Sequence, residues 1–349
     1  MMRAIDFFCG GGGMTHGLLA AGIRVLAGID VCPDYQKTYE ENNKNLFIAK
    51  SISDVSEDDI LKLIPDIYTA NDILFAGCAP CQPFSKQRNS PEEHKDRSLL
   101  IEFGNIVAKF RPAYVIVENV PGIKGKGIDV FNQFLKILDE NGYHYRHSVL
   151  NARDFGVPQN RKRLVLIASR VTEVVLPDPI FDGQENPYRT VADAIAAYPE
   201  IQAGQEHNNI PNHKATTLSQ LNLKRIRATV HDGGSRTDWP EELVLKCHKT
   251  KKSGHTDVYG RMAWNSVAPT LTSKCCSLSN GRYGHPEQDR AISFREAAAL
   301  QSFPDSYIFY GKSDSIIARQ IGNAVPVLLA KAIGETVKKT FETRRDNKN

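Results

Sequence analysis

The sequence predicts an α/β fold whose chemistry lies at one edge of a mostly parallel sheet. Three short apolar runs, Arg3–Phe8, Ile73–Ala76 and Tyr114–Val117, each lead into glycine-rich or polar residues. Runs of this length that end in Gly, Pro or a polar residue are typical of buried strands that pass into loops. In an open α/β sheet, the loops at the carboxyl ends of the strands form the ligand site. A chain of 349 residues has room for such a domain and for a second, smaller unit.

The first two expected strands point to a cofactor. The run Arg3–Phe8 opens into Cys9-Gly10-Gly11-Gly12-Gly13, and the helical pattern Leu18–Ala21 follows. A strand, a glycine turn and a helix N-terminus in this order let backbone N–H groups approach a ligand closely. The second strand, Arg24–Ile29, ends in Asp30. A carboxylate at that place can accept hydrogen bonds from the ribose hydroxyls of an adenosine-bearing cofactor.

The segment Gly77–Ser85 contains two cysteines and allows three interpretations. Cys81 could be a nucleophile at the sheet edge, Cys78-Ala79-Pro80-Cys81 could be a redox C-x-x-C motif, or both cysteines could simply pack in the core. A redox motif would run into a helix from its first cysteine, and Pro80 with Pro83 would break that helix. The prolines therefore argue against the redox motif and leave a nucleophilic Cys81 and two packing cysteines as the alternatives.

The following elements are expected to complete the first domain. Leu99–Phe110 and Ile128–Asn141 have helical patterns, and Leu164–Ala168 is an apolar strand. The long polar segment Lys86–Ser98 is typical of a functional loop. Glu118 follows a fully apolar strand, where an acid is costly unless it is partnered or used in chemistry.

Beyond Val171 the alternation of strands and helices stops, and Leu176–Pro179 resembles a linker. The segment Glu206–Thr256 has nine Lys and Arg residues and five acidic residues, and this surplus of four positive charges equals the net charge of the whole chain, +4. The segment also contains five of the ten histidines. Such a concentration of donors suits phosphate contacts, although a solvated basic face is about equally compatible with it. We expect a second domain to begin near residue 173.

Composition excludes several other classes of protein. Apolar residues make up 41% and charged residues 24% of the chain, as in ordinary globular proteins. We expect no membrane span, because no apolar stretch approaches the ~20 residues that one needs, and no signal peptide. Seven cysteines without a small-scaffold spacing fit a reducing compartment. No zinc spacing joins Cys247, His248, His255, Cys275 and Cys276, so we predict no metal site.

Several blocks resemble one family in that family's order. Pro80-Cys81-Gln82-x-Phe84-Ser85 resembles the nucleophile loop of DNA cytosine-5 methyltransferases, and Asp6-x-Phe8-x-Gly10-x-Gly12-Gly13 resembles the S-adenosylmethionine loop. The other blocks are Glu118-Asn119-Val120, Gln159-x-Arg161-x-Arg163, the stretch from His285 to Pro304, and Gln320–Pro326. The chain is thereby identified as a member of the bacterial type of this family outside about Thr172–Thr256. The resemblance implies a Rossmann-like methyltransferase sheet with a smaller, irregular target-recognition domain. By this resemblance, residues 1–172 plus 306–349 would form the catalytic and cofactor-binding domain, and residues 173–305 the target-recognition (DNA-binding) domain.

The resemblance also implies the binding residues. S-adenosylmethionine, with S-adenosylhomocysteine as its product, would be held by Phe8, Gly10, Gly12, Gly13, Asp30, Val31, Ser51, Ile52, Pro80, Asn323 and Ala324. The chain departs from the family pattern at Asp30, where Glu is usual, and at Ser51-Ile52, where Asp-Ile is usual. Gln82, Ser85, Asn119 and Gln159 would contact the substrate.

For catalysis, the resemblance implies that Cys81 attacks carbon 6 of a flipped-out cytosine. Glu118, with its pKa raised by burial, would hold a proton at ring nitrogen 3, and Arg163 would bind the exocyclic oxygen with support from Arg161. The expected partner is double-stranded DNA, and the expected protein is a cytoplasmic, nucleoid-associated monomer that needs no metal. A role in restriction-modification is compatible with this family.

Two alternatives remain at this stage. A transfer-RNA methyltransferase of the same fold would carry a Cys-Phe-Thr signature, which the sequence lacks. A non-catalytic DNA-binding relative should have lost Cys81 or Glu118, and both are present.

Overall fold

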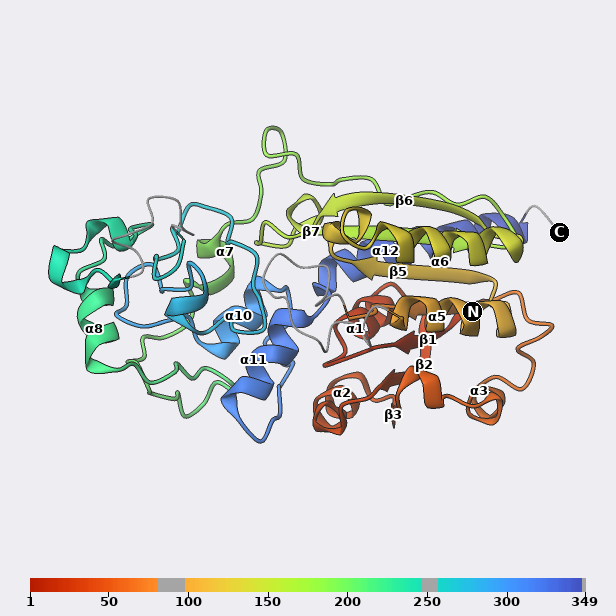
Figure 1. Ribbon diagram of the computed structural model, residues 1–349, viewed down its shortest axis with the longest axis horizontal. Helices are drawn as coiled ribbons and strands as arrows, with labels where there is room; N and C mark the ends of the chain where they lie inside the picture. The colour runs from red at the N-terminus through yellow and green to blue at the C-terminus, as the bar shows by residue number, and fades with distance from the viewer. Residues whose placement is uncertain (81–97, 247–256, 347–349) are drawn as a thin grey trace. The chain divides into compact units, whose positions relative to one another are not determined.

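A computed structural model describes residues 1–80, 98–246 and 257–346 (Figure 1). The chain divides into two compact units, which we call the first and second units. The first consists of Met1–Phe155, Lys162–Ile180 and Val325–Asn349, and the second of Gly156–Arg161 and Phe181–Ala324. These bounds differ from the expected division, because residues 156–161 and 306–324 belong to the second unit and residues 173–180 to the first. That the second unit binds DNA stays a prediction.

The first unit contains a seven-stranded sheet with the strand order β3-β2-β1-β4-β5-β7-β6. The first five strands in this order are parallel, whereas β7 runs antiparallel to both of its neighbours. This is the α/β methyltransferase sheet that the sequence predicts. The strands are β1 (Arg3–Phe7), β2 (Arg24–Asp30), β3 (Leu46–Ala49), β4 (Ile73–Gly77), β5 (Tyr114–Asn119), β6 (His144–Asn151) and β7 (Lys162–Ser169).

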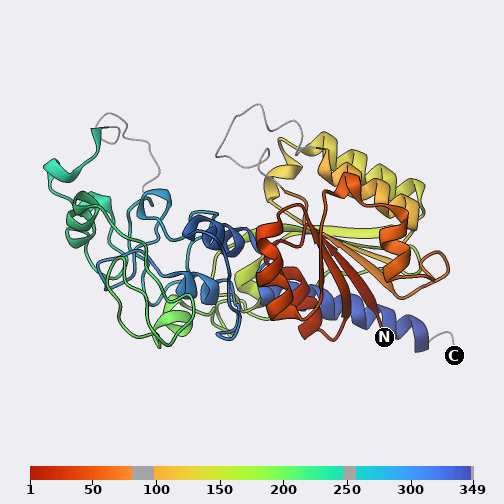
Figure 2. The same cartoon turned by 90° about the horizontal axis from the view of Figure 1, so that it is seen from below.

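Helices cover both faces of this sheet (Figure 2). One face packs on α3 (Glu57–Leu63), α5 (Leu99–Phe110) and α6 (Ile128–Glu140) through a continuous apolar core. On the other face, α1 (Gly13–Ala20) packs on α12 (Val327–Asp346). A Cβ atom at Gly17 would lie 2.4 Å from the Cβ of Ala330, so only glycine allows these two backbones to approach so closely.

Most predicted elements of the first unit are confirmed, and α5 has the expected bounds. The sequence analysis did not identify β3, β6 or α3. β6 is an edge strand in which exposed and partly buried residues alternate, so it has no continuous apolar run. After β2 the chain forms the 3-10 turn η1 (Pro33–Tyr35) and continues as α2 (Gln36–Asn43).

The segment Asp314–Asp346, which includes α12, is long and apolar enough to cross a membrane by composition alone. The expectation that no such stretch exists was therefore wrong by that criterion. However, 56% of its most apolar window is buried inside the protein, and α12 packs on α1. These facts describe a core helix of a folded domain.

The second unit has little regular structure among its described residues. Its helices are α7 (Val191–Ile195), α8 (Gln220–Arg227), α10 (Phe294–Leu300) and α11 (Asp314–Asn323), with the 3-10 turns η6 (Arg236–Asp238), η7 (Glu241–Leu243) and η8 (Leu278–Asn280). Irregular backbone leaves buried carbonyl groups that need donors. Arg261, which is fully buried, donates to the carbonyls of Thr229, His285, Gln288 and Ile226.

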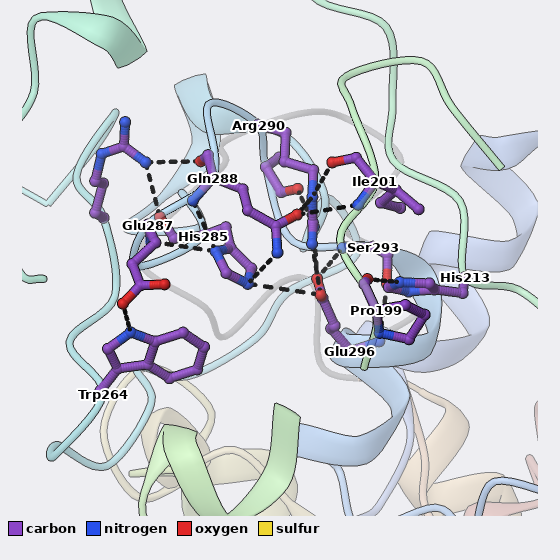
Figure 3. Close-up of polar contacts among 12 residues, drawn as sticks. Pro199, Ile201, His213, Trp264, His285, Glu287, Gln288, Arg290, Ser293 and Glu296 are labelled. Atoms are coloured by element: carbon purple, nitrogen blue, oxygen red, sulfur yellow. Dashed lines mark hydrogen bonds and ion pairs between the residues drawn. The ribbon is translucent and has the colours of Figure 1, made fainter. Parts of the chain in front are cut away.

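A polar cluster around α10 stabilises the same unit (Figure 3). The carboxylate of Glu296 accepts hydrogen bonds from Nη1 and Nη2 of Arg290, each at 2.7 Å, and from the backbone N–H of Ser293 at 2.7 Å. His213 contacts the hydroxyl of Ser293 at 2.9 Å, and Nε2 of His285 lies 3.8 Å from Glu296. The ion pair is thus buried with its hydrogen bonds satisfied.

Candidate active site

The carboxyl ends of β1, β2, β4 and β5 meet at one edge of the sheet, because these strands are parallel. Phe8, Asp30, Cys78 and Glu118 lie at this edge. β7 runs the other way, so its first residues, Lys162 and Arg163, join the same edge. The strand topology therefore gathers most of the predicted site residues of the first unit.

Glu118 and Arg163 form an ion pair. Glu118 lies opposite Val165 in the antiparallel register of β5 and β7, and Arg163 is two residues before Val165, so both side chains project from one face. Nε of Arg163 lies 2.9 Å from Oε1 of Glu118, and the side chains are 13% and 9% exposed. Nη1 of Arg163 also donates to the carbonyl of Lys162 at 2.8 Å. The sequence analysis predicted both residues, but it did not predict their contact.

Asn119 connects the end of β5 to the cysteine segment. Its Oδ1 accepts from the N–H of Val120 at 2.9 Å, and its Nδ2 donates to the carbonyl of Ala79 at 3.5 Å. Pro80 follows Ala79 and is the last described residue before the gap. Cys81, Gln82 and Ser85 lie outside the described residues, as does the predicted loop up to residue 97.

The glycine loop after β1 forms a cradle. Gly10 and Gly12 have φ values of 54° and 89°, which favour glycine, and Gly13 begins α1. A Cβ atom at Gly10 would meet nothing within 4 Å, so the backbone borders open space. Phe8 has a φ of 60°, a costly conformation for a bulky residue that is often found at ligand sites.

Asp30 lies beside this cradle. Its Oδ2 accepts from the N–H of Gly10 at 2.9 Å, and its Oδ1 accepts from the N–H of Cys32 at 2.9 Å. Burial raises the pKa of Asp30 above its usual value. Each oxygen retains a second lone pair that can accept from a hydroxyl group. Val31 is 68% exposed and offers an apolar surface next to it.

These features fit an adenosine-bearing cofactor: open space above a glycine, a carboxylate with acceptor capacity, and an exposed apolar side chain. Ser51 and Ile52 were also predicted to bind the cofactor. They lie at the start of the 3-10 turn η2 (Ile52–Asp54), directly after β3, with Ile52 buried and the Ser51 hydroxyl 2.9 Å from that of Ser53.

Asp6 is a buried acid to which the sequence analysis gave no separate role. It is fully buried in β1, and its Oδ2 accepts from the hydroxyl of Thr15 at 2.7 Å and from the N–H of Thr15 at 3.1 Å. Burial raises the pKa of Asp6 to about 7, against the opposing effect of these hydrogen bonds. Asp6 thus ties the first turn of α1 to the sheet. The sequence signal for this contact was an acidic residue inside an otherwise apolar strand.

Arg161 and Gln159, predicted to contact the target base or its surroundings, belong to the second unit. The guanidinium of Arg161 is buried, with 2% of the residue exposed, and donates to the carbonyls of Leu271, Gly322 and Ala324. Gln159 is also fully buried. The structure therefore gives Arg161 and Arg163 different partners. That Arg161 supports Arg163 at the target base stays a prediction.

Asn323 and Ala324, the last predicted cofactor residues, end α11 in the second unit. Asn323 is exposed, and the carbonyl of Ala324 accepts from Arg161. Cys275 and Cys276 are buried with their sulfur atoms 3.8 Å apart. Across the described ranges, no group of three or more His, Cys, Asp or Glu could hold a metal ion. Cys247, His248 and His255 fall in the gap at 247–256.

A family model, relatives in sequence and a solved structure that resemble this chain are all described as methylases or methyltransferases. The family model described as C-5 cytosine-specific DNA methylase matches residues 2–339. The chain is 44% identical to the Type II methylase M.HgiDII of Herpetosiphon aurantiacus, over 97% of this chain and 95% of that protein. It is 35% identical to the Type II methyltransferase M1.HphI of Haemophilus parahaemolyticus, with 96% and 86% covered. A prophage-encoded E. coli protein described as a DNA modification methyltransferase has a similar fold, with a TM-score of 0.75, 22% identity, and 98% and 100% covered.

Proposed function

Because the chain belongs to the C-5 cytosine-specific DNA methylase family, we propose that it methylates carbon 5 of one cytosine in a specific double-stranded DNA sequence, giving 5-methylcytosine. The observation that carries this proposal is the Glu118–Arg163 pair at the sheet edge where the Pro80-Cys81-Gln82 segment begins. Bound S-adenosylmethionine supplies the methyl group as an electrophilic sulfonium and leaves as S-adenosylhomocysteine.

Cys81 is the proposed nucleophile. Carbon 5 of cytosine is a poor nucleophile until the sulfur of Cys81 forms a bond to carbon 6 and pushes electrons into the ring. A free thiol with a pKa of about 8.5 is only a few per cent ionised at neutral pH, so its surroundings must favour the thiolate. After methylation, loss of the carbon 5 proton to water lets the carbon–sulfur bond break and regenerates Cys81.

Glu118 and Arg163 stabilise the charge that builds up on the ring. Arg163 contacts Oε1 of Glu118, which leaves Oε2 to hold a proton at ring nitrogen 3. The remaining guanidinium N–H groups of Arg163 bind the exocyclic oxygen. Arg161 is proposed to support Arg163 in this role, and Asn119 donates to the carbonyl of Ala79, two residues before Cys81.

The cofactor residues of the first unit are proposed as Phe8, Gly10, Gly12, Gly13, Asp30, Val31, Ser51, Ile52 and Pro80, and those of the second unit as Asn323 and Ala324. Gln82, Ser85 and Gln159 complete the proposed substrate site, Gln159 by positioning rather than by contact. The fit of the glycine cradle and Asp30 to an adenosine-bearing ligand supports this assignment.

Residues 173–305, most of which belong to the second unit, are the proposed DNA-binding domain. Its α8 exposes Lys224 and Arg227 and buries Arg225 between Trp239 and Tyr259, with the guanidinium carbon 5.5 Å from each ring centroid. Exposed basic side chains on a fixed helix suit contacts to DNA phosphates. Contacts of this kind help to offset the cost of flipping the target base out of the duplex.

The names of the relatives support a role as the modification enzyme of a restriction-modification system. We propose that the protein acts as a monomer in the cytoplasm, associated with the nucleoid through DNA. No observation in the structure favours the transfer-RNA alternative.

The test is methyl transfer from labelled S-adenosylmethionine to duplex DNA and, in parallel, to transfer RNA, with bisulfite sequencing of the product. We expect methylation of one cytosine in a short recurring DNA sequence. Cys81→Ala should abolish the transfer, and the matched variant Cys78→Ala should retain it. Label in RNA alone, or equal loss in both variants, would contradict the proposal.

A further inference from the structure

The side chain of Arg161 joins, by a hydrogen bond, two points at which the chain leaves the second unit. The chain passes into the first unit after Arg161 and again after Ala324. Nη2 of Arg161 donates to the carbonyl of Ala324 at 3.1 Å and to that of Gly322 at 3.2 Å, while Nη1 donates to the carbonyl of Leu271 at 2.8 Å. Arg161 therefore fixes the backbone at both exits.

Two glutamines extend this contact into a network, which we call the Gln159–Arg161–Gln301 network. Gln301 is fully buried, and its Nε2 donates to the carbonyl of Ile321 at 2.8 Å. Its Oε1 accepts from Nε2 of Gln159 at 2.8 Å, and Oε1 of Gln159 accepts from the N–H of Leu271 at 2.9 Å. Both amide groups thus have their donor and acceptor atoms in use.

The network acts on the end of α11. The last carbonyls of a helix have no partner inside the helix and need donors from elsewhere. Here Gln301 donates to the carbonyl of Ile321. Arg161 donates to the carbonyl of Gly322 and to that of Ala324, which lies just after the helix. Packing adds a further constraint, because a Cβ atom at Gly322 would lie 1.8 Å from the carbonyl oxygen of Thr272. This backbone can therefore adopt few other positions.

We propose that Gln301 and Arg161 are positioning residues for cofactor binding: they hold the Ile321–Ala324 backbone and, through it, present the exposed Asn323. This inference rests on the proposed function, in which Asn323 and Ala324 contact S-adenosylmethionine. It gives Arg161 a role other than contact with the target base. It also gives a role to Gln301, a residue that no step of the proposed mechanism uses.

The experiment measures the dissociation constant of S-adenosylmethionine by calorimetry in the absence of DNA. No target base is present, so a residue that acts only on the base cannot change the result. We expect Gln301→Met and Arg161→Lys to weaken cofactor binding about five- to twentyfold, since each removes a donor to the α11 carbonyls. Under saturating cofactor, methyl transfer by Gln301→Met should fall much less than its cofactor affinity does.

Two further variants make the result decisive. Asn323→Ala removes an exposed side chain, so it should weaken cofactor binding without lowering the thermal unfolding midpoint. Thr229→Val is the matched control, because Thr229 is a buried residue of the same unit that bonds Trp239 and the carbonyl of Arg225. It should lower stability and leave the cofactor dissociation constant unchanged.

Several outcomes would overturn the inference. Wild-type affinity in Gln301→Met and Arg161→Lys would do so, as would wild-type affinity in Asn323→Ala. Loss of methyl transfer at saturating cofactor in Arg161→Lys, with normal cofactor binding, would restore Arg161 as a ligand of the base. A wild-type protein that neither binds S-adenosylmethionine nor methylates DNA would instead refute the proposed function itself.

Discussion

Two Arg–Glu pairs, one in each unit, combine the same residue types in different surroundings. In the second unit, Arg290 and Glu296 make two hydrogen bonds of 2.7 Å, the N–H of Ser293 supplies a third, and the side chains are 0% and 1% exposed. In the first unit, Nε of Arg163 lies 2.9 Å from Oε1 of Glu118, and the side chains are 13% and 9% exposed. The Arg290–Glu296 pair therefore has its hydrogen bonds satisfied within the protein, whereas the Arg163–Glu118 pair has polar atoms left for a ligand.

The difference affects what each carboxylate can do. Burial alone would raise the pKa of Glu296, but the hydrogen bonds from Arg290 outweigh it and hold the pKa below its usual value. Glu296 therefore stays ionised and stabilises the fold. Glu118 lies at the sheet edge with one oxygen in use, so a ring nitrogen can share the other. A buried ion pair indicates catalysis only when its geometry is incomplete.

Glu118→Gln should have the largest effect, and on activity. The variant keeps the size of the side chain but cannot exchange a proton with ring nitrogen 3. We expect methyl transfer to fall by about 10²- to 10⁴-fold, while the thermal unfolding midpoint stays close to that of the wild type. Single-turnover rates with saturating DNA and cofactor measure this loss. A loss of stability in proportion to the loss of activity would make Glu118 a structural residue like Glu296.

Glu296→Gln should show the opposite pattern. The change leaves the guanidinium of Arg290 buried without a counter-charge, which in other proteins costs about 3–5 kcal/mol of unfolding free energy. Urea denaturation measures this cost. Methyl transfer per folded molecule, at a temperature well below the unfolding midpoint, should stay within about twofold of wild type. A hundredfold loss of activity in a protein of normal stability would refute the distinction between the two pairs.

The closed cluster should also make stability depend on pH through His285. Its burial lowers its pKa from 6.5 to about 4, with opposing attraction from Glu296 and added repulsion from Arg290, Arg261 and His213. The folded state therefore holds His285 neutral while the unfolded state binds a proton below pH 6.5. Stability is complete above pH 6.5 and is lost as the pH falls towards about 4.

Between pH 6.5 and pH 5 the loss assigned to His285 should be about 2 kcal/mol. Denaturation at both pH values measures it, and His285→Asn, which keeps an acceptor for the N–H groups of Glu287 and Gln288, should reduce the pH dependence. His144→Asn, at an exposed pair in the first unit, is the control and should not. Equal pH dependence in all three proteins would show that His285 is not responsible.

Much of the first unit could be predicted from sequence, because its strands are continuous apolar runs that end in glycine or in an acid. β6 could not, since this edge strand has no continuous apolar run. β3 is an apolar run of four residues, but it ends in Lys50 rather than in glycine or an acid, and it was not identified. The block Gln159–Arg163 is contiguous in sequence and resembles one functional unit, yet the chain changes compact unit between Arg161 and Lys162. The partners of Arg161 lie 110 to 163 residues away, and no local pattern reveals such contacts.

The same holds for the two Arg–Glu pairs, because the hydrogen bonds that close one and leave the other open come from tertiary structure. Cys81, whose sequence context is the most specific in the chain, lies outside the described residues, so its role depends on the family and on the proposed experiment.

Glu140→Gln should have the smallest effect. Glu140 pairs with Lys136 at 3.7 Å on α6, one turn away, and the side chains are 61% and 74% exposed. Solvent screens such a pair, and holding two long side chains in one geometry costs entropy, so the change should cost about 0.3 kcal/mol of stability and no activity. The substitution is chemically the same as at Glu118 and Glu296, and urea denaturation with a methyl-transfer assay compares all three. If Glu140→Gln cost as much stability as Glu296→Gln, burial and hydrogen bonding would not be what separates a stabilising carboxylate from a dispensable one.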